Sequence, residues 1–250
     1  MEESVPLSPR PSLGALALGI FFSPHKTMAA IVEHPTWLFP LLLTAVLSGV
    51  GASVIYKPII VPIQISKMEA KSQDMPAGQL DKMEQQMNKP VWAAVTGVGW
   101  VLLAAGTVLV MAAMLYFLGS LIFGGQSTFK AVFSVVAWTS LIAVLSMVLQ
   151  TPIRLLRVQG MDPTDFPAAL ESLGGLGFLV PANSGSFAMG MARGVLGSIE
   201  LFWLWQCAVL VEGVALAFKK PRSFGLTCVA VIWVLGALLA AVAGGFQAKG

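Results

Sequence analysis

The most constraining feature of this sequence is a set of four long stretches without any Asp, Glu, Lys or Arg. The stretches cover residues 34–56, 90–129, 131–153 and 223–248. A helix needs about 20 predominantly apolar residues to cross the hydrocarbon core of a bilayer, so each stretch can hold a span. Only 11% of the residues are charged, against about 25% in soluble domains, which leaves too little polar surface to cover a soluble core. The sequence therefore predicts an integral membrane protein.

Helices are the expected form of these spans, because backbone polar groups in lipid must be satisfied within the segment. We predict an all-α, polytopic membrane protein with a bundle of five transmembrane helices. The spans are expected at about residues 37–56, 91–118, 131–150, 201–218 and 224–246. The stretch after Pro90 is long enough for two spans, but its polar break comes only at residues 119–128. We therefore interpret it as one long, tilted helix followed by a tight turn.

The fourth span contains an acidic residue, Glu212. A carboxyl near the centre of a spanning helix costs about 2.5–3.5 kcal/mol, while each large apolar residue returns about 0.3–0.6 kcal/mol. The Leu, Val and Phe residues of this segment bring the sum close to balance, and neighbouring helices can shelter the carboxyl. We therefore keep this segment as a span.

The first part of the chain is expected to form an N-terminal arm, residues 1–36, ahead of a membrane domain at residues 37–250. Residues 13–22 are apolar but only half a span long. No small-residue cleavage site follows them, so an interfacial helix is favoured over the core of a signal peptide.

Two stretches between spans are read as segments outside the bundle. Residues 57–89 predict a loop that carries a short amphipathic helix with Leu80, Met83 and Met87 on one face. This helix is expected to rest on the membrane or the bundle, with a partner-binding helix as the alternative. Residues 172–192 are uncharged but rich in Gly, Pro, Asn and Ser, so an interfacial or re-entrant excursion is favoured over a sixth span. A helix over residues 187–199 can lead into the fourth span.

Polar residues within the fourth span give the candidate intramembrane polar site, which comprises Glu212, Glu200 and Gln206. An ionisable group in a span usually faces the bundle interior, so Glu212 suggests a proton- or ion-linked role or a buried lock between helices. The structural alternative is that Glu212 lies near the headgroups. Glu200 begins the helix, where a carboxylate favours the helix N-terminus. Gln206, with Gln150 and Thr107, is expected to form interhelical hydrogen bonds.

Small residues recur at every fourth position of the first span, at Ala45, Gly49 and Ser53. This spacing lets helices approach closely, so we predict a helix-packing face, with an oligomer interface as the alternative. Gly190 and Gly194 have the same spacing, but they lie outside a predicted span and carry little weight.

Motifs that would indicate an enzyme or a cofactor are missing from the sequence. His25 and His34 have no cysteine or carboxylate partners at metal-ligand spacing. Cys207 and Cys228 lie in apolar runs and are read as small buried hydrophobes. There is no phosphate-binding loop and no Gly-x-Ser-x-Gly elbow. We predict no catalytic, cofactor-binding or metal-binding residues. The scattered basic residues and the net charge of +3 also argue against nucleic acid as a partner.

Four segments together resemble the bacterial Yip-domain family, whose members are relatives of the eukaryotic Ypt/Rab-GTPase-interacting proteins. The segments are FSPHKTM at residues 22–28, EHPTWLFPL at 33–41, FGGQSTFK at 123–130 and LGSIELFWLW at 196–205. Their order and spacing carry the resemblance, although family members often have Asp where this chain has Glu200. The resemblance implies a five-span bundle with a cytoplasmic N-terminus, whereas positively charged residues alone leave the orientation near even. The acidic-aromatic Tyr-Gly-Pro signature of the Rab-binding members is absent, so Rab binding is not transferred.

The sequence leaves three classes of function open. The favoured one is a non-enzymatic adaptor or membrane-organising protein of the cell membrane, with the lipid bilayer and a membrane-protein partner or a second copy as its contacts. The alternative is a small transporter or channel component that uses Glu212 and the Gly-rich residues 172–186. An intramembrane enzyme would need at least two converging polar groups, and the sequence offers only Glu212.

Overall fold

The structure is a computed structural model that describes residues 11–71, 78–166, 170, 175–180, 186–197 and 199–247. All the regular structure in these residues is helical. The α-helices are α1 (Leu13–Phe22), α2 (Pro24–Glu33), α3 (Leu38–Ile55), α4 (Val61–Lys71), α5 (Gln79–Met87), α6 (Pro90–Phe117), α7 (Phe129–Arg157), α9 (Phe187–Gly197), α10 (Leu201–Ala217) and α11 (Arg222–Gln247). Short π-helices, η1 (Tyr56–Ile60) and η2 (Leu118–Ile122), and a 3₁₀-helix, η3 (Leu176–Leu179), complete the set.

Four helical segments within the described residues are long and apolar enough to cross a membrane, namely Leu38–Ala70, Pro90–Ile122, Phe129–Arg157 and Arg222–Gly245. A fifth span forms if α9 and α10, which meet at a bend of 60°, count as one. The predicted all-α, polytopic membrane fold with a short apolar N-terminal helix is confirmed. Residues 172–174 and 181–185 of the predicted excursion lie outside the described residues.

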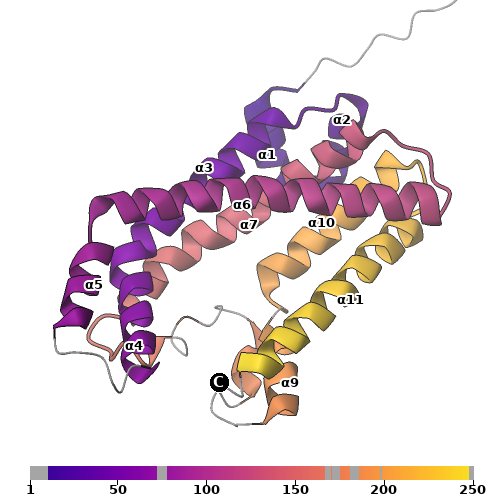
Figure 1. Cartoon of the computed structure of the whole chain (residues 1–250). Coiled ribbons are helices and arrows are strands. Elements are labelled where there is room, and N and C mark those ends of the chain that lie inside the picture. The colour runs from indigo at the N-terminus through magenta and orange to yellow at the C-terminus, as the bar shows by residue number, and fades with distance from the viewer. Residues whose placement is uncertain are drawn as a thin grey trace, which may run out of the picture.

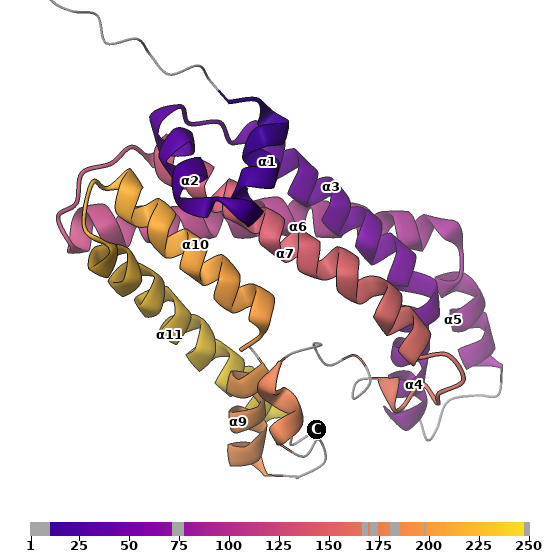
Figure 2. The same cartoon turned by 180° about the vertical axis from the view of Figure 1, so that it is seen from behind.

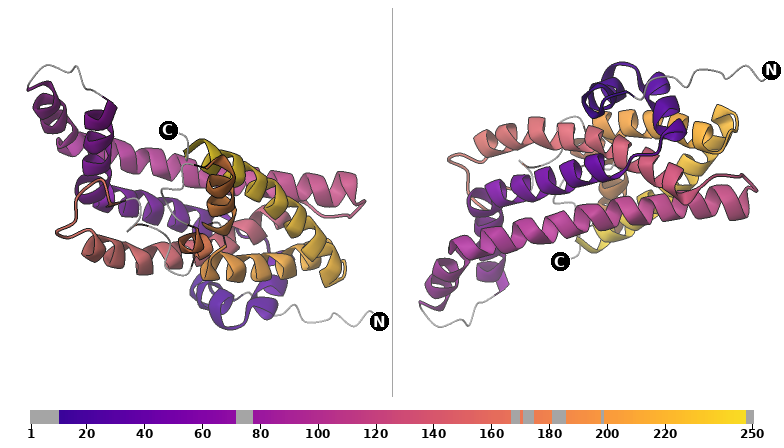
Figure 3. Two further views of the ribbon diagram at one scale, coloured as in Figure 1. Left: turned by 90° about the horizontal axis from the view of Figure 1, so that it is seen from below. Right: turned by 90° about the horizontal axis from the view of Figure 1, so that it is seen from above.

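Successive spans alternate in direction, so the connections gather at two ends of the bundle (Figures 1 and 3). We call one the proximal end, which holds α1, α2, the α6–α7 connection and the α10–α11 turn. The other is the distal end, which holds α4, α5, α9 and the last turns of α11. Figure 2 shows α1 and α2 folded against the proximal part of α7 and α10.

The first spanning helix is longer than predicted. We expected it to end at residue 56 and to be followed by a loop, whereas η1 and α4 continue it to Lys71. Pro58 has no backbone N–H for the α-helical ladder, and it lies in η1, a single π-helical turn of the kind that interrupts α-helices. Charged residues beyond the apolar run leave the hydrocarbon core without ending the helix. The predicted amphipathic helix is present as α5.

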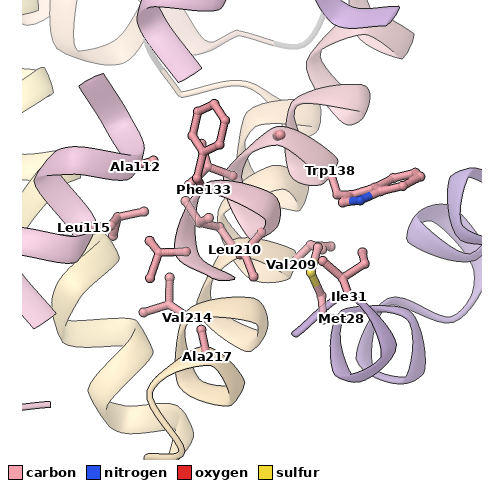
Figure 4. Close-up of a cluster of buried hydrophobic side chains, with 14 of the residues drawn as sticks. Met28, Ile31, Ala112, Leu115, Phe133, Trp138, Val209, Leu210, Val214 and Ala217 are labelled. Carbon is pink, nitrogen blue, oxygen red and sulfur yellow. The ribbon is translucent and has the colours of Figure 1, made fainter. Parts of the chain in front are cut away.

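Helix α7 forms the centre of the bundle. In its most apolar window 72% of the residues are buried by other parts of the protein, against 17% for the segment that contains α6. Figure 4 shows side chains of α2, α6 and α10 gathered with Phe133 and Trp138 of α7 in the hydrophobic core. The buried hydroxyls of α7 are satisfied locally or across helices. Ser140 Oγ, for example, lies 2.7 Å from the Ala137 carbonyl oxygen and 2.8 Å from Thr44 Oγ1.

The predicted packing stripe on α3 faces α6. Gly49 lies so close to α6 that a Cβ atom there would come within 2.8 Å of the carbonyl oxygen of Gly97. Ser53 Oγ donates to the Gly49 carbonyl of its own helix at 2.9 Å and lies 3.1 Å from the Ala93 carbonyl of α6, while Ala45 is buried. These small residues let the two backbones approach.

A second close contact joins α9 to α11, and here the low weight given to Gly190 and Gly194 was wrong. A Cβ atom on Gly244 would meet the Gly190 carbonyl oxygen at 2.3 Å, and one on Gly194 would meet the Ala240 carbonyl oxygen at 2.3 Å. Spacing alone did not reveal this contact, because the partner glycine lies some 50 residues further along the chain.

Candidate functional site

The candidate site is a cluster of three charged or polar side chains at the proximal end. Glu212 lies on α10, and its side chain is only 8% exposed. One carboxylate oxygen, Oε1, pairs with Nδ1 of His25 on α2, and the other, Oε2, accepts a hydrogen bond from Nε of Arg222 on α11. We call this cluster the Glu212 latch, because it joins α2, α10 and α11.

The α10–α11 turn brings Arg222 back to Glu212. The N–H of Lys219 donates to the Leu216 carbonyl at 3.1 Å, and the N–H of Lys220 donates to the Ala215 carbonyl at 2.9 Å. This pair of bonds is the Schellman arrangement that closes helix C-termini, and it puts Lys219 in the left-handed region with a φ of 52°. Pro221 cannot continue α10, and α11 begins directly after it.

His25 is placed by the break between α1 and α2. Pro24 occupies the first turn of α2, where its missing N–H costs nothing, and His25 follows it. One turn later Met28 is fully buried in the core. A Cβ on Gly213 of α10 would come within 3.0 Å of Met28 Sδ, so this glycine allows α2 to cross α10 closely beside Glu212.

The three side chains of the latch differ in exposure, because the carboxylate is buried and its two partners are exposed. A carboxylate removed from water is costly unless it is paired and hydrogen-bonded, and Glu212 has a partner on each oxygen. Those partners remain at the protein surface, since the His25 and Arg222 side chains are 64% and 76% exposed. The latch therefore lies at the surface of the bundle, beside the α10–α11 turn. It borders a pocket of about 460 Å³ lined by His25, Glu212, Ala215, Leu216, Lys220 and Arg222.

The other two predicted site residues do not join this cluster. Glu200 is the N-cap residue of α10 and lies twelve residues from Glu212, about 18 Å along the helix. Its Oε2 is 3.5 Å from Nε2 of buried Gln150, which also reaches Ser146 Oγ at 2.7 Å. Gln206 is half-buried between the two carboxylates. The three residues predicted as one polar site thus occupy different levels of α10.

Thr107 also departs from its predicted role. Its hydroxyl donates to the Leu103 carbonyl of its own helix at 2.8 Å and is exposed, so it is not the interhelical bond that we expected. A Thr hydroxyl can donate its hydrogen bond to the carbonyl one turn earlier in its own helix. The sequence does not distinguish such a bond from one that crosses to another helix.

Sequence reasoning missed the partners of Glu212. His25 was considered only as a metal ligand, and Arg222 was not considered as a partner of Glu212. The useful signal was the expense of a carboxylate in a span, which demands a cationic partner at the same depth. Glu212 lies one and a half turns from the end of α10, so a basic residue that flanks the span, such as Arg222, could have been predicted as its partner.

Comparison with known proteins gives one family match. The family model described as the Yip1 domain matches residues 18–244. That range includes the latch and every described spanning helix almost in full. No curated protein and no solved structure matches the chain.

Proposed function

The chain belongs to the Yip1-domain family, and on that basis we propose that it is a non-enzymatic adaptor or membrane-organising protein. Its contacts would be the bilayer and a membrane-protein partner or a second copy. We further propose that residues 1–36 form an arm that packs on a membrane domain at residues 37–250.

One observation carries this proposal, namely the position and pairing of Glu212. A carboxylate that moves protons or ions through a membrane is expected to face a path across the bilayer. Glu212 instead lies at the proximal end, with one helix-joining partner on each oxygen. Its geometry fits a lock between helices, which supports a scaffold over the transporter alternative.

The proposal is tested with the full-length chain and its Glu212→Gln variant in native membranes. The scaffold role predicts that mild detergent extracts the chain with a stoichiometric partner, either a protein or a second copy, and that reciprocal capture of that partner recovers the chain. A folded Glu212→Gln variant should retain the partner. An ion or solute flux in reconstituted vesicles that disappears in folded Glu212→Gln protein would instead establish the transporter alternative.

We also propose that the N-terminus is cytoplasmic. The family resemblance supports this orientation, and so does the short cationic turn Lys219–Arg222, because short positively charged loops favour the cytoplasmic side. In a Cys207→Ser, Cys228→Ser background, Lys82→Cys should react with an impermeant maleimide in intact cells. Lys26→Cys should react only after permeabilisation. The reverse pattern would show the opposite orientation.

A further inference from the structure

The pocket beside the Glu212 latch combines exposed cations with an apolar floor. Lys220 and Arg222 line it together with Ala215 and Leu216. Both cationic side chains are exposed. Arg222 uses Nε toward Glu212, and a guanidinium carries five N–H donors in all. Its terminal nitrogens therefore offer donors to an anion in the pocket.

Charge at the proximal end favours an anion. The described Lys and Arg residues there are Lys26, Lys130, Lys219, Lys220 and Arg222, and the described carboxylates are Glu33 and Glu212. Glu212 alone would repel a phosphate from the pocket, but Arg222 and His25 are already paired with it. Lys220 then adds positive charge to a site whose carboxylate is balanced.

The depth of the pocket indicates which anion it suits. It lies where α10 ends and α11 begins, at the level expected for lipid headgroups. Below it, Ala208, Leu204 and Leu201 precede Glu212 by four, eight and eleven residues, the spacing of one helix face. Leu204 and Leu201 are 49% and 67% exposed. From Ala208 to Leu201 this apolar track is about 10 Å long, roughly a third of the thickness of the hydrocarbon core.

We propose that this pocket binds one anionic phospholipid, with its phosphate at Lys220 and Arg222 and an acyl chain along the Leu201–Leu204–Ala208 track of α10. The apolar track gives a reason to prefer a lipid over free phosphate, because an inorganic ion would leave the track unused. The inference does not depend on the scaffold role, since either a scaffold or a transporter could carry a bound lipid.

The test measures lipid retention by the full-length chain with native mass spectrometry in detergent. The probes are dioleoylphosphatidylglycerol, dioleoylphosphatidylcholine, a dihexanoyl phosphatidylglycerol and inorganic phosphate. We expect one long-chain phosphatidylglycerol to bind at least five-fold more tightly than the phosphatidylcholine. The short-chain lipid should bind more weakly than the long-chain one, and inorganic phosphate should not displace the long-chain lipid.

Lys220→Gln is the informative variant, because it leaves the Glu212 latch intact. It should weaken phosphatidylglycerol binding about five-fold, the equivalent of the roughly 1 kcal/mol that one cation near an anionic surface contributes. Binding of phosphatidylcholine should not change. Lys82→Gln, an exposed lysine on α5 at the distal end, is the matched control and should bind phosphatidylglycerol like the parent chain.

Several results would overturn the proposal. Equal binding of the two dioleoyl lipids would show that the protein does not prefer the anionic headgroup. Equal losses of phosphatidylglycerol binding in Lys220→Gln and Lys82→Gln would show that the lipid does not bind at Lys220. Equal affinity for the short-chain lipid, or full displacement by phosphate, would show an anion site without an acyl track. None of these results bears on partner capture, so failure here is distinguishable from failure of the scaffold proposal.

Discussion

Replacing both side-chain partners of Glu212 should destabilise the bundle more than replacing Glu212 itself. His25→Gln with Arg222→Gln leaves a carboxylate that is 8% exposed without a cation, and an uncompensated buried charge costs about 3–5 kcal/mol. We expect about 3 kcal/mol, because the pocket admits water. Glu212→Gln leaves the His25 and Arg222 side chains unpaired, but both are well exposed, so neither is left as a buried polar group. Its cost should be about 1 kcal/mol, the upper range for pairs with exposed partners.

The decisive comparison is the triple variant, with Gln at all three positions. Adding Glu212→Gln to the double variant removes the buried charge, so about 2 kcal/mol of stability should return. The free energy of unfolding can be measured by titrating SDS into mild-detergent micelles and following helix content by far-ultraviolet circular dichroism. Additive losses in the triple variant, or equal losses in Glu212→Gln and the double variant, would refute the argument that Glu212 is a desolvated carboxylate held by two exposed partners.

Three further outcomes follow from individual contacts. Gly49→Ala should destabilise the bundle by about 1–3 kcal/mol, because the new Cβ would lie 2.6 Å from Val101 Cγ2 and 2.8 Å from the Gly97 carbonyl oxygen. The control is Gly99→Ala, whose Cβ would have nothing within 4 Å and which should be neutral in the same SDS titration. Gly244→Ala should loosen α9 from α11, seen as faster hydrogen exchange in α9, while Gly236→Ala, also open, should leave exchange unchanged. The hydroxyl and the backbone N–H of Thr164 donate hydrogen bonds to the exposed carboxylate of Asp162, and these bonds hold the pKa of Asp162 below its ordinary value. The stabilisation that these bonds give to the turn is therefore present above the unfolded-state pKa and is lost as pH falls through the lower folded-state pKa. Carboxyl NMR titration should find that low pKa, and Thr164→Val should raise it.

The spanning helices were predictable because their signal is local. Twenty or more predominantly apolar residues in a row can cross a bilayer only in a form with internal backbone hydrogen bonds, and α6, α7 and α11 follow such runs closely. The end of the first span was predicted too early, since the first charge after an apolar run marks the membrane boundary and not the end of the helix. Lys57 lies inside η1, and the helix continues through the rest of η1 and all of α4 to Lys71.

Burial within the bundle was not predictable from hydropathy. The segments that contain α6 and α7 are similarly apolar, yet 17% of one window and 72% of the other are buried by protein. Lipid and a protein core are both apolar, so no solvent contrast separates the two faces of a spanning helix. The better signal lay in small polar residues. Ser134, Thr139 and Ser140 on α7 are all buried, as expected where hydroxyls need protein acceptors.

The candidate site shows the same division between local and distant information. Glu212 was identified from its own segment, because the cost of a carboxylate in a span is a property of that residue alone. Its partners come from positions 187 residues before it and ten residues after it, and nothing local in the α2 sequence points to the contact. The Glu212 latch therefore fixes the position of α2 on the bundle. His25 of α2 pairs with Glu212 of α10, and Met28 of α2 is buried in the core. This contact, with a sheltered carboxylate and two exposed partners, holds α2, α10 and α11 together at the proximal end. A fixed surface at headgroup depth is what either a lipid or a protein partner would need to bind.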